Sequence, residues 1–519
     1  CPACAPRGRV VLPSMKTTGV TRIPVRARTH VQRYFGNLSY VPTLVKLAVP
    51  IALQHLLMTV LNLADTLMVG QLGEVQIGAI ALGNQIFFLL MLFLFGVGSG
   101  SAVFASQYWG RRDVAGVRRA MGISLLTGCA GALVFTALGV FAPELLLSVF
   151  TSDPAVISEG AGYLRIVALS YLVTSISMGY VHALRSVGDT RLPLYATAIS
   201  ITLNVAGNYV LIFGALGFPA LGVQGAAIAT AIARVVELSL ILLVVYRRKG
   251  PTAATLADLL RFDWTFARRF YGRAMPVIFN EIFWSLGFTM YTVVFARMGT
   301  SHLAAYTIAD TVGRLLLVMF IGSSQASAIL LGNVIGEGSG NAERSADTAL
   351  GRGVNTGIAS AQHIGASLIK ILPVASAVLG LVVFTAVAPW VPSLFEVSEE
   401  VRRMVTLLVR SFAVVMVAKI LNMHIVVGIL RGGGDTRIAL LVDVGFLWIV
   451  GVPAAFIAGL VFQLPVHVVY LCIGLEEAAK LAVGIPRILS GRWVNDLTAA
   501  DDPLHAVIPD ASDAAGFPL

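Results

Sequence analysis

The chain contains two related copies of one long segment, and this duplication limits the folds open to it. The octapeptide at 184–191, Leu-Arg-Ser-Val-Gly-Asp-Thr-Arg, returns at 430–437 as Leu-Arg-Gly-Gly-Gly-Asp-Thr-Arg. A shift of 226 positions also aligns residues 50–110 with residues 276–336 without a gap, with proline on proline at the start and glycine on glycine at the end. The repeats therefore predict two structurally related halves.

The composition indicates a membrane environment for both copies. Hydrophobic residues make up 57% of the chain, charged residues 12%, and the mean hydropathy is +0.84. This leaves too little polar surface to coat a water-soluble globule, so we predict an all-α integral membrane protein. Twelve apolar stretches are long enough to cross a bilayer as helices, six in each copy: 43–69, 76–106, 115–142, 160–184, 192–213, 221–246, 266–296, 302–332, 364–388, 404–430, 438–460 and 464–486. Because six is even, both copies enter the membrane in the same direction, as parallel repeats that form two lobes around a central cavity.

Positive charge gathers on alternate loops, and this sets the expected orientation. Seven Lys and Arg residues precede the first stretch, four lie between the second and third, and seven more lie between Arg247 and Arg273. We therefore place these loops and both termini in the cytoplasm, with the protein as a multi-pass component of the plasma (inner) membrane. Because the net charge of +10 is accounted for by this topology signal, no nucleic-acid partner is expected.

The second copy is longer than the first. The octapeptides are 246 positions apart, whereas the earlier alignment needs a shift of 226, so 20 residues have been added between them. The added residues best correspond to the polar, glycine-rich run 338–362. The predicted parts of the chain are a cytoplasmic basic N-terminal segment (1–40), an N-lobe (41–246), a cytoplasmic linker (247–265), a C-lobe (266–490) with an insertion near 338–362, and a cytoplasmic C-terminal tail (491–519).

Asp65 is the most informative polar residue in the first copy. An ionisable side chain inside a bilayer costs roughly 2.5–3.5 kcal/mol on insertion scales, so it requires a partner, a wet cavity or a function. Asn204 and Asn208 lie one turn apart on the fifth helix, and Thr230 on the sixth could add a hydroxyl. This set suits either an oxygen cage for Na⁺, with Asp65, Asn204 and Asn208 as metal ligands, or a network that tunes proton affinity. In the alternative interpretation, Asp65 caps a broken helix and the asparagines only join helices.

The second copy differs from the first at this point. Glu281 follows Pro276 by five residues, but the alignment places it on His55 rather than on Asp65. We predict Glu281 as a second ion-coupling residue, with pairing to a nearby base as the alternative. Pro50 and Pro276 are predicted helix hinges, because proline removes a backbone donor. The candidates for lining the substrate cavity are Gln54, Asn280, Phe283, Trp284 and Tyr291. The aromatic members would offer cation–π surface if they face the cavity, and none if they face lipid.

Other charged residues within the helices suggest structural pairs. Asp310 and Arg314 are four positions apart on one helix, and Arg234 and Glu237 are three apart on another. We expect each pair to neutralise itself within its helix. Lys419 and Asp443 are expected to pair between helices. We predict that these three pairs are structural rather than functional: Asp310–Arg314, Arg234–Glu237 and Lys419–Asp443.

The chain carries none of the catalytic motifs that would suit a membrane enzyme. The G-x-S-G, H-E-x-x-H and G-x-x-x-x-G-K-[ST] patterns are absent from the sequence, so we predict neither an enzyme nor ATP-driven transport. The energy for transport would then come from an ion gradient. No cofactor is expected beyond Na⁺ or H⁺ as the coupling ion.

In their order along the chain, these features resemble the multidrug and toxic compound extrusion (MATE) family. They are Pro50, the Asp-Thr-Leu-Met-Val-Gly run from Asp65, Gln107 with Gly110, the first octapeptide, and Asn204 with Asn208. The resemblance implies a V-shaped pair of lobes that exports bulky, often cationic organic compounds in exchange for Na⁺ or H⁺.

The resemblance also implies residue roles. The family's amino-lobe ion site falls on four residues of this chain: Asp65, Asn204, Asn208 and Thr230. Asn208 stands where some members have a second Asp. The carboxy-lobe site of sodium-coupled members matches Glu281, but their partner acid falls near Ile420, beside Lys419. The expected partners are small organic substrates, the coupling ion and the lipid bilayer, with the protein as a monomer. The alternatives are a related flippase for a lipid-linked oligosaccharide or polysaccharide, and a non-transporting membrane enzyme or scaffold.

Overall fold

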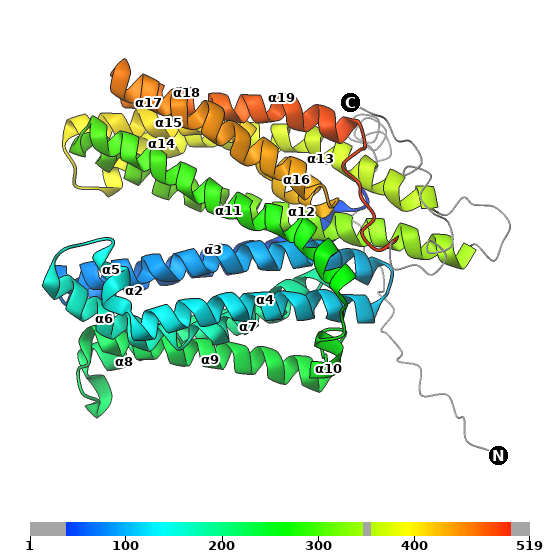
Figure 1. The fold of residues 1–519 in the computed structure, drawn as a ribbon. Helices are drawn as coiled ribbons and strands as arrows, with labels where there is room; N and C mark the ends of the chain where they lie inside the picture. Colours follow the sequence, from blue (N-terminus) through cyan, green and yellow to red (C-terminus); the bar gives the residue numbers. More distant parts are fainter. Residues whose placement is uncertain (1–37, 346–353, 500–519) are drawn as a thin grey trace, which may run out of the picture.

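Two bundles of long helices lie side by side in the computed structural model, which describes residues 38–345 and 354–499 (Figure 1). The first bundle is called the N-lobe and contains α2 (Val41–Gly70), α3 (Glu74–Gly110), α4 (Val114–Phe141), α5 (Pro143–Ser148), α6 (Pro154–Ala168), α7 (Tyr171–Ser186), α8 (Arg191–Phe213), η1 (Ala215–Gly217) and α9 (Gly222–Arg248). A short helix, α10 (Leu256–Leu259), lies in the connection to the second bundle.

The second bundle, called the C-lobe, begins with two very long helices and ends in a series of shorter ones. Its α-helices are α11 (Trp264–Met298), α12 (Thr300–Ser345), α13 (Val354–Val382), α14 (Ala388–Trp390), α15 (Glu399–Met423), α16 (Thr436–Leu440), α17 (Val452–Phe456), α18 (Val466–Ile473) and α19 (Leu475–Leu489). Wider π-helical turns and one 3-10 turn continue several of them: η2 (Val383–Val387), η3 (Val391–Leu394), η4 (His424–Leu430), η5 (Leu441–Gly445), η6 (Leu447–Gly451) and η7 (Ile457–Val461). The two bundles are the two lobes that the duplication predicts.

Ten helices in the described residues are long and apolar enough to cross a membrane, and the number rises to eleven if the pair α6 and α7, bent by 48°, is one span. The prediction of twelve spans differs at the last one. The stretch expected to form it holds α18 and α19, which meet at Gly474 and are only 8 and 15 residues long. The described residues therefore hold ten candidate spans, or up to eleven with the bent pair, and the chain is a multi-span helical membrane protein.

The helices begin where short polar side chains satisfy their first backbone N–H groups. Asp113 accepts from the backbone of Gly116 at the start of α4, and Asp263 accepts from Phe266 at the start of α11. Proline does not end these helices: α2 continues as one helix through Pro50. α11 likewise continues through its own proline, Pro276, so both predicted hinge positions lie inside continuous helices.

The predicted insertion is helical on both sides of residues 346–353, which lie outside the described residues together with 1–37 and 500–519. Helix α12 runs beyond its expected end, and α13 begins before its expected start. The two extensions touch at glycine, because a Cβ added to Gly338 would lie 2.4 Å from the Cα of Gly357. Small residues allow such close backbone contact between helices.

The two lobes meet where α12 packs on α2 and α3, and where α11 packs on α3. At one end of this interface, α3 and α12 touch through their glycines. A Cβ on Gly110 would lie 2.1 Å from the carbonyl oxygen of Asn333, and a Cβ on Gly336 would lie 1.9 Å from that of Gln107. We call this the gate contact. The alignment pairs Gln107 with Asn333 and Gly110 with Gly336, so the gate contact joins equivalent positions of the two copies.

The chain after α19 closes over the same end of the interface. In this segment, residues 491–499, the backbone N–H of Asn495 donates to the carbonyl of Gly433 at 2.8 Å. The side-chain oxygen of Gln107 accepts from the N–H of Leu497 at 2.8 Å, and its amide nitrogen donates to the carbonyl of Asn495 at 3.1 Å. We call this segment the C-terminal strap. It binds α3 of the N-lobe to the C-lobe, so this part of the predicted tail belongs to the packed structure.

Candidate functional site

Asp65 lies at the end of a hydrogen-bonded network that joins three N-lobe helices. The amide nitrogen of Asn208 on α8 donates to the Oδ1 of Asp65 on α2 at 2.7 Å, and to the Oδ1 of Asn204 at 3.2 Å. Asn204 in turn donates to the hydroxyl of Thr230 on α9 at 3.1 Å. The structure therefore brings together all four residues of the predicted N-lobe ion site. The side-chain oxygen of Asn208 has no hydrogen-bond partner among the described residues.

Arg234 connects this network with a second one deeper in the N-lobe. It interacts electrostatically with Asp65 and forms an ion pair of 3.0 Å with Glu237, which confirms the predicted Arg234–Glu237 pair. Glu237 accepts from the hydroxyl of Thr197 at 2.7 Å, and Thr197 accepts from the amide of Gln54 at 2.8 Å. Gln54 is buried, with 4% of its surface exposed. This predicted cavity residue is thus part of a packed polar chain inside the N-lobe.

Glu281 is held by a base in the C-lobe. Its carboxylate lies 2.8 Å from the guanidinium of Arg431, whose side chain is only 2% exposed. The neighbouring Asn280 donates to Asp443 at 2.9 Å. Arg431 sits directly after η4, where the helix leaves regular α geometry, a feature that is frequent at functional sites. The structure therefore places Glu281 in an ion pair and not beside Asp65.

A second ion-paired cluster lies next to it. The prediction that Lys419 pairs with Asp443 is wrong, because Lys480 on α19 takes that place with an Nζ to Oδ1 distance of 2.9 Å. Lys480 also lies 3.4 Å from Glu476, which accepts from the hydroxyl of Tyr291. The ammonium of Lys419 instead lies over an aromatic ring, that of Phe288, at 4.9 Å. The predicted Asp310–Arg314 pair is confirmed, at 2.7 Å.

A cavity of about 290 Å³, called the C-lobe cavity, is lined by residues of the C-lobe together with Phe95 of α3. Asn280, Glu281 and Trp284 line it from α11, whereas Phe283 is not among its lining residues and Tyr291 lies at a smaller neighbouring pocket. Acidic and basic side chains line the cavity in equal number, namely Glu281, Asp310, Asp443 and Glu477 against Arg314, Lys419, Arg431 and Lys480. Aromatic and charged surfaces are thus combined in one space large enough for an organic molecule.

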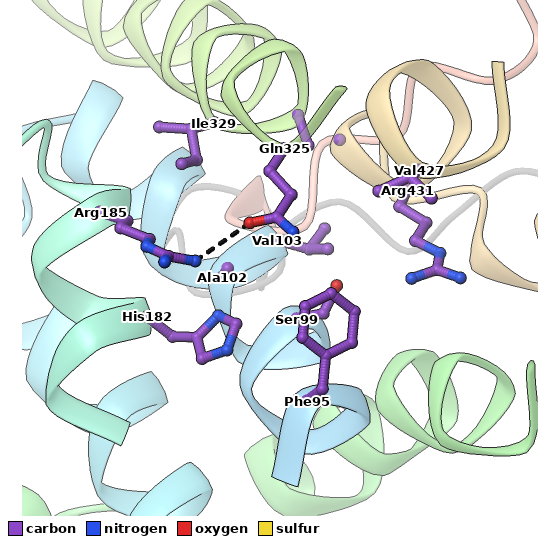
Figure 2. A pocket seen from close by; sticks show the side chains of 12 residues that line it. Phe95, Ser99, Ala102, Val103, His182, Arg185, Gln325, Ile329, Val427 and Arg431 are labelled. Atoms are coloured by element: carbon purple, nitrogen blue, oxygen red, sulfur yellow. Dashed lines mark hydrogen bonds between the residues drawn. The ribbon is translucent and has the colours of Figure 1, made fainter. Parts of the chain in front are cut away.

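A smaller pocket of about 40 Å³ lies between the lobes (Figure 2). Two arginines reach it, Arg185 at the end of α7 and Arg431 from the C-lobe. These are the second residues of the two repeated octapeptides, and sequence reasoning did not single them out as site residues. The repeat itself carried the signal. Leucine, both arginines, one glycine, aspartate and threonine occupy the same positions in the two octapeptides.

Comparison with known proteins identifies this architecture. The family model MatE matches residues 50–210. A protein of Thermotoga maritima named "Probable multidrug resistance protein NorM" is 24% identical over 457 residues, which cover 87% of this chain and 92% of that protein.

Two solved structures share the fold. The Vibrio cholerae MATE transporter VcmN, in a mutant form, matches with a TM-score of 0.77 and 17% identity, over 88% of this chain and 98% of that one. A MATE protein in the bent conformation matches with a TM-score of 0.74 and 21% identity, over 87% and 96%.

Two related helical lobes, with polar networks buried inside each, define a multi-span membrane transporter rather than an enzyme. With the family match over residues 50–210 added to this fold, the chain is similar to transporters of the MATE family.

Proposed function

We propose that this protein exports small organic compounds, often cationic, by exchange with Na⁺ or H⁺ that binds at Asp65. The observation that carries the proposal is the network around this carboxylate. Asp65 lies among buried amides on α8, and within the described residues its carboxylate accepts one hydrogen bond, from Asn208. Such an intramembrane carboxylate is suited to accept a cation whose arrival changes its contacts.

The two candidate ions make different demands on this site. Asn208 now presents its amide nitrogen to both Asp65 and Asn204, so a sodium ion would require the amide to turn its unpartnered oxygen inward. A proton would bind Asp65 without that rotation. In both cases the charge of the carboxylate is neutralised, and α2 is then free to bend around Pro50. Movement of α2 against α12 would change the contact between the lobes.

Glu281 is the second candidate for ion coupling. Because its carboxylate is paired with Arg431, a cation can bind there only if Arg431 first withdraws. We therefore assign the primary coupling step to Asp65 and a C-lobe role to Glu281 that depends on the position of Arg431.

The C-lobe cavity is the proposed substrate site. The rings of Trp284 and Phe288 lie against each other within it, with centroids 4.4 Å apart and planes tilted by 43°, and offer an aromatic surface. The equal number of acids and bases suits an amphipathic compound. A flippase for a lipid-linked sugar would favour a basic cavity, which this is not. We propose further that the protein acts as a monomer in the plasma membrane, with the gate contact and the C-terminal strap on the cytoplasmic side.

Efflux of ethidium from cells tests the proposal. Cells that produce the protein should lose dye faster than empty cells, and Asp65→Asn should reduce the rate to that of empty cells. Glu144→Gln is the matched control, because this carboxylate on α5 forms a half-exposed ion pair with Arg165. Equal efflux by Asp65→Asn and Glu144→Gln under both Na⁺ and H⁺ gradients would contradict the proposed role of Asp65.

A further inference from the structure

The small pocket between the lobes is built from equivalent positions of the two copies. The lining pairs related by the 226-position shift or, for the arginines, the 246-position shift are Ser99 with Gln325, Ala102 with Ala328, Val103 with Ile329, and Arg185 with Arg431. The pocket therefore lies on the pseudo-twofold axis of the protein. Figure 2 shows Arg185 and Arg431 on opposite sides of it, with Ser99 and Phe95 between them.

The lining of this pocket is mostly apolar, and all of its ionisable side chains are basic. It includes two arginines and His182, and no Asp or Glu is among its lining residues in the described part of the chain. Arg185 is 7% exposed and donates to the side-chain oxygens of Gln54 and Gln325, at 2.5 and 3.0 Å. Both partners are neutral amides. Within the described residues Arg185 forms no ion pair, and Arg431 has only Glu281, which lies outside the lining.

A buried guanidinium without a counter-charge is costly in a membrane protein. The Nε atoms of Arg185 and Arg431 are buried, and neither has a hydrogen-bond partner among the described residues. No hydrogen bond to another described residue occupies the hydroxyl of Ser99 or the ring nitrogens of His182, which can also donate into the pocket. The site thus offers hydrogen-bond donors and positive charge, a combination that suits an anion.

The size of the pocket selects the class of anion. Its volume is about 40 Å³, whereas one water-sized sphere takes about 10–15 Å³ on the same measure. There is room for a monatomic anion with little water, but not for an organic carboxylate of drug size.

We propose that this pocket binds one chloride-sized inorganic anion between Arg185 and Arg431. The anion neutralises Arg185 and ties α7 of the N-lobe to the end of η4 in the C-lobe. Because the two arginines belong to different lobes, separation of the lobes would open the site and release the ion. Binding therefore stabilises the arrangement in which the lobes meet, and by linkage this arrangement binds the anion most tightly.

Thermal unfolding of the purified full chain in detergent tests this site. Tryptophan fluorescence is followed in sodium chloride, sodium bromide and sodium gluconate at equal concentration, so that the sodium ion available to Asp65 is constant. We expect the halides to raise the melting temperature by about 2 °C or more over gluconate, saturably with concentration. Arg185→Gln should abolish this difference, and Arg165→Gln, which removes a half-exposed arginine on α6, should retain it.

A halide effect that survives in Arg185→Gln, or equal melting temperatures in all three salts, would overturn the proposal. If Arg185→Gln does not fold, binding of ³⁶Cl⁻ to the native chain decides. We expect one ion per chain, displaced by bromide but not by gluconate and lost in Ser99→Val, which fills the pocket. Absence of binding, or unchanged binding in Ser99→Val, would refute the site. Neither measurement involves transport. The anion site can therefore be confirmed or refuted whatever the outcome of the efflux test at Asp65.

Discussion

Gly336→Ala should force the lobes apart at the gate contact. The added Cβ would lie 1.9 Å from the carbonyl oxygen of Gln107 and 2.7 Å from its carbonyl carbon, whereas ordinary contact begins at 3.4 Å. α3 and α12 must therefore separate by about 1.5 Å, the difference between 3.4 and 1.9 Å. Because the obstructing atoms are backbone, no side-chain rotation relieves the overlap. Overpacking of this kind costs about 1–3 kcal/mol, which corresponds to a shift of about 5–150-fold in a conformational equilibrium.

Electron-spin distance measurements can detect this separation. Spin labels on Ala115 of α4 and Glu337 of α12, both exposed at the gate end, should show a longer or broader distance distribution in Gly336→Ala than in the native chain. Gly272→Ala is the matched control, because a Cβ at this position on α11 would meet nothing within 4 Å. If the two alanine variants give the same distances and the same melting temperature, the inferred role of the gate contact is wrong.

Two further pairs of variants test the packing. Trp493→Ala removes the buried anchor of the C-terminal strap and should destabilise the protein by about 3–5 kcal/mol in a thermal melt. Trp264→Ala, at a residue that is 80% exposed, should change stability by less than about 0.5 kcal/mol. Equal effects of the two variants would show that the strap is not anchored at Trp493. Lys480→Met leaves Asp443 and Glu476 without their base and should cost about 3–5 kcal/mol. Arg165→Met breaks a half-exposed pair and should cost about 0–1 kcal/mol, so similar melting temperatures for the two methionine variants would contradict the buried network.

The N-lobe network could be predicted because its parts are marked locally. Asn204 and Asn208 are four positions apart, so any helix places them on one face. A polar partner for Asp65 was expected because an isolated carboxylate in the bilayer is costly in free energy. The structure brings these three residues together with Thr230. The family resemblance pointed to the same residues.

The C-lobe pairing could not be predicted, because it depends on how the helices rotate against one another. Lys419, Lys480 and Asp443 all line the C-lobe cavity. Only the packing of α19 decides that Lys480, and not Lys419, pairs with Asp443. Arg185 was hidden for a different reason. A repeated arginine near a helix end suggests a topology anchor, and its burial between the lobes follows from contacts far away in sequence, with Gln54 and Gln325.

The most direct test of the central claim, that a cation at Asp65 drives export, uses the purified protein in liposomes. Dye movement is measured with a Na⁺ gradient alone, with a proton gradient alone and with neither. The native protein should move dye faster under at least one of the two gradients, and Asp65→Asn should move it at the gradient-free rate in all three. A gradient response of Asp65→Asn equal to that of the native protein would contradict the account.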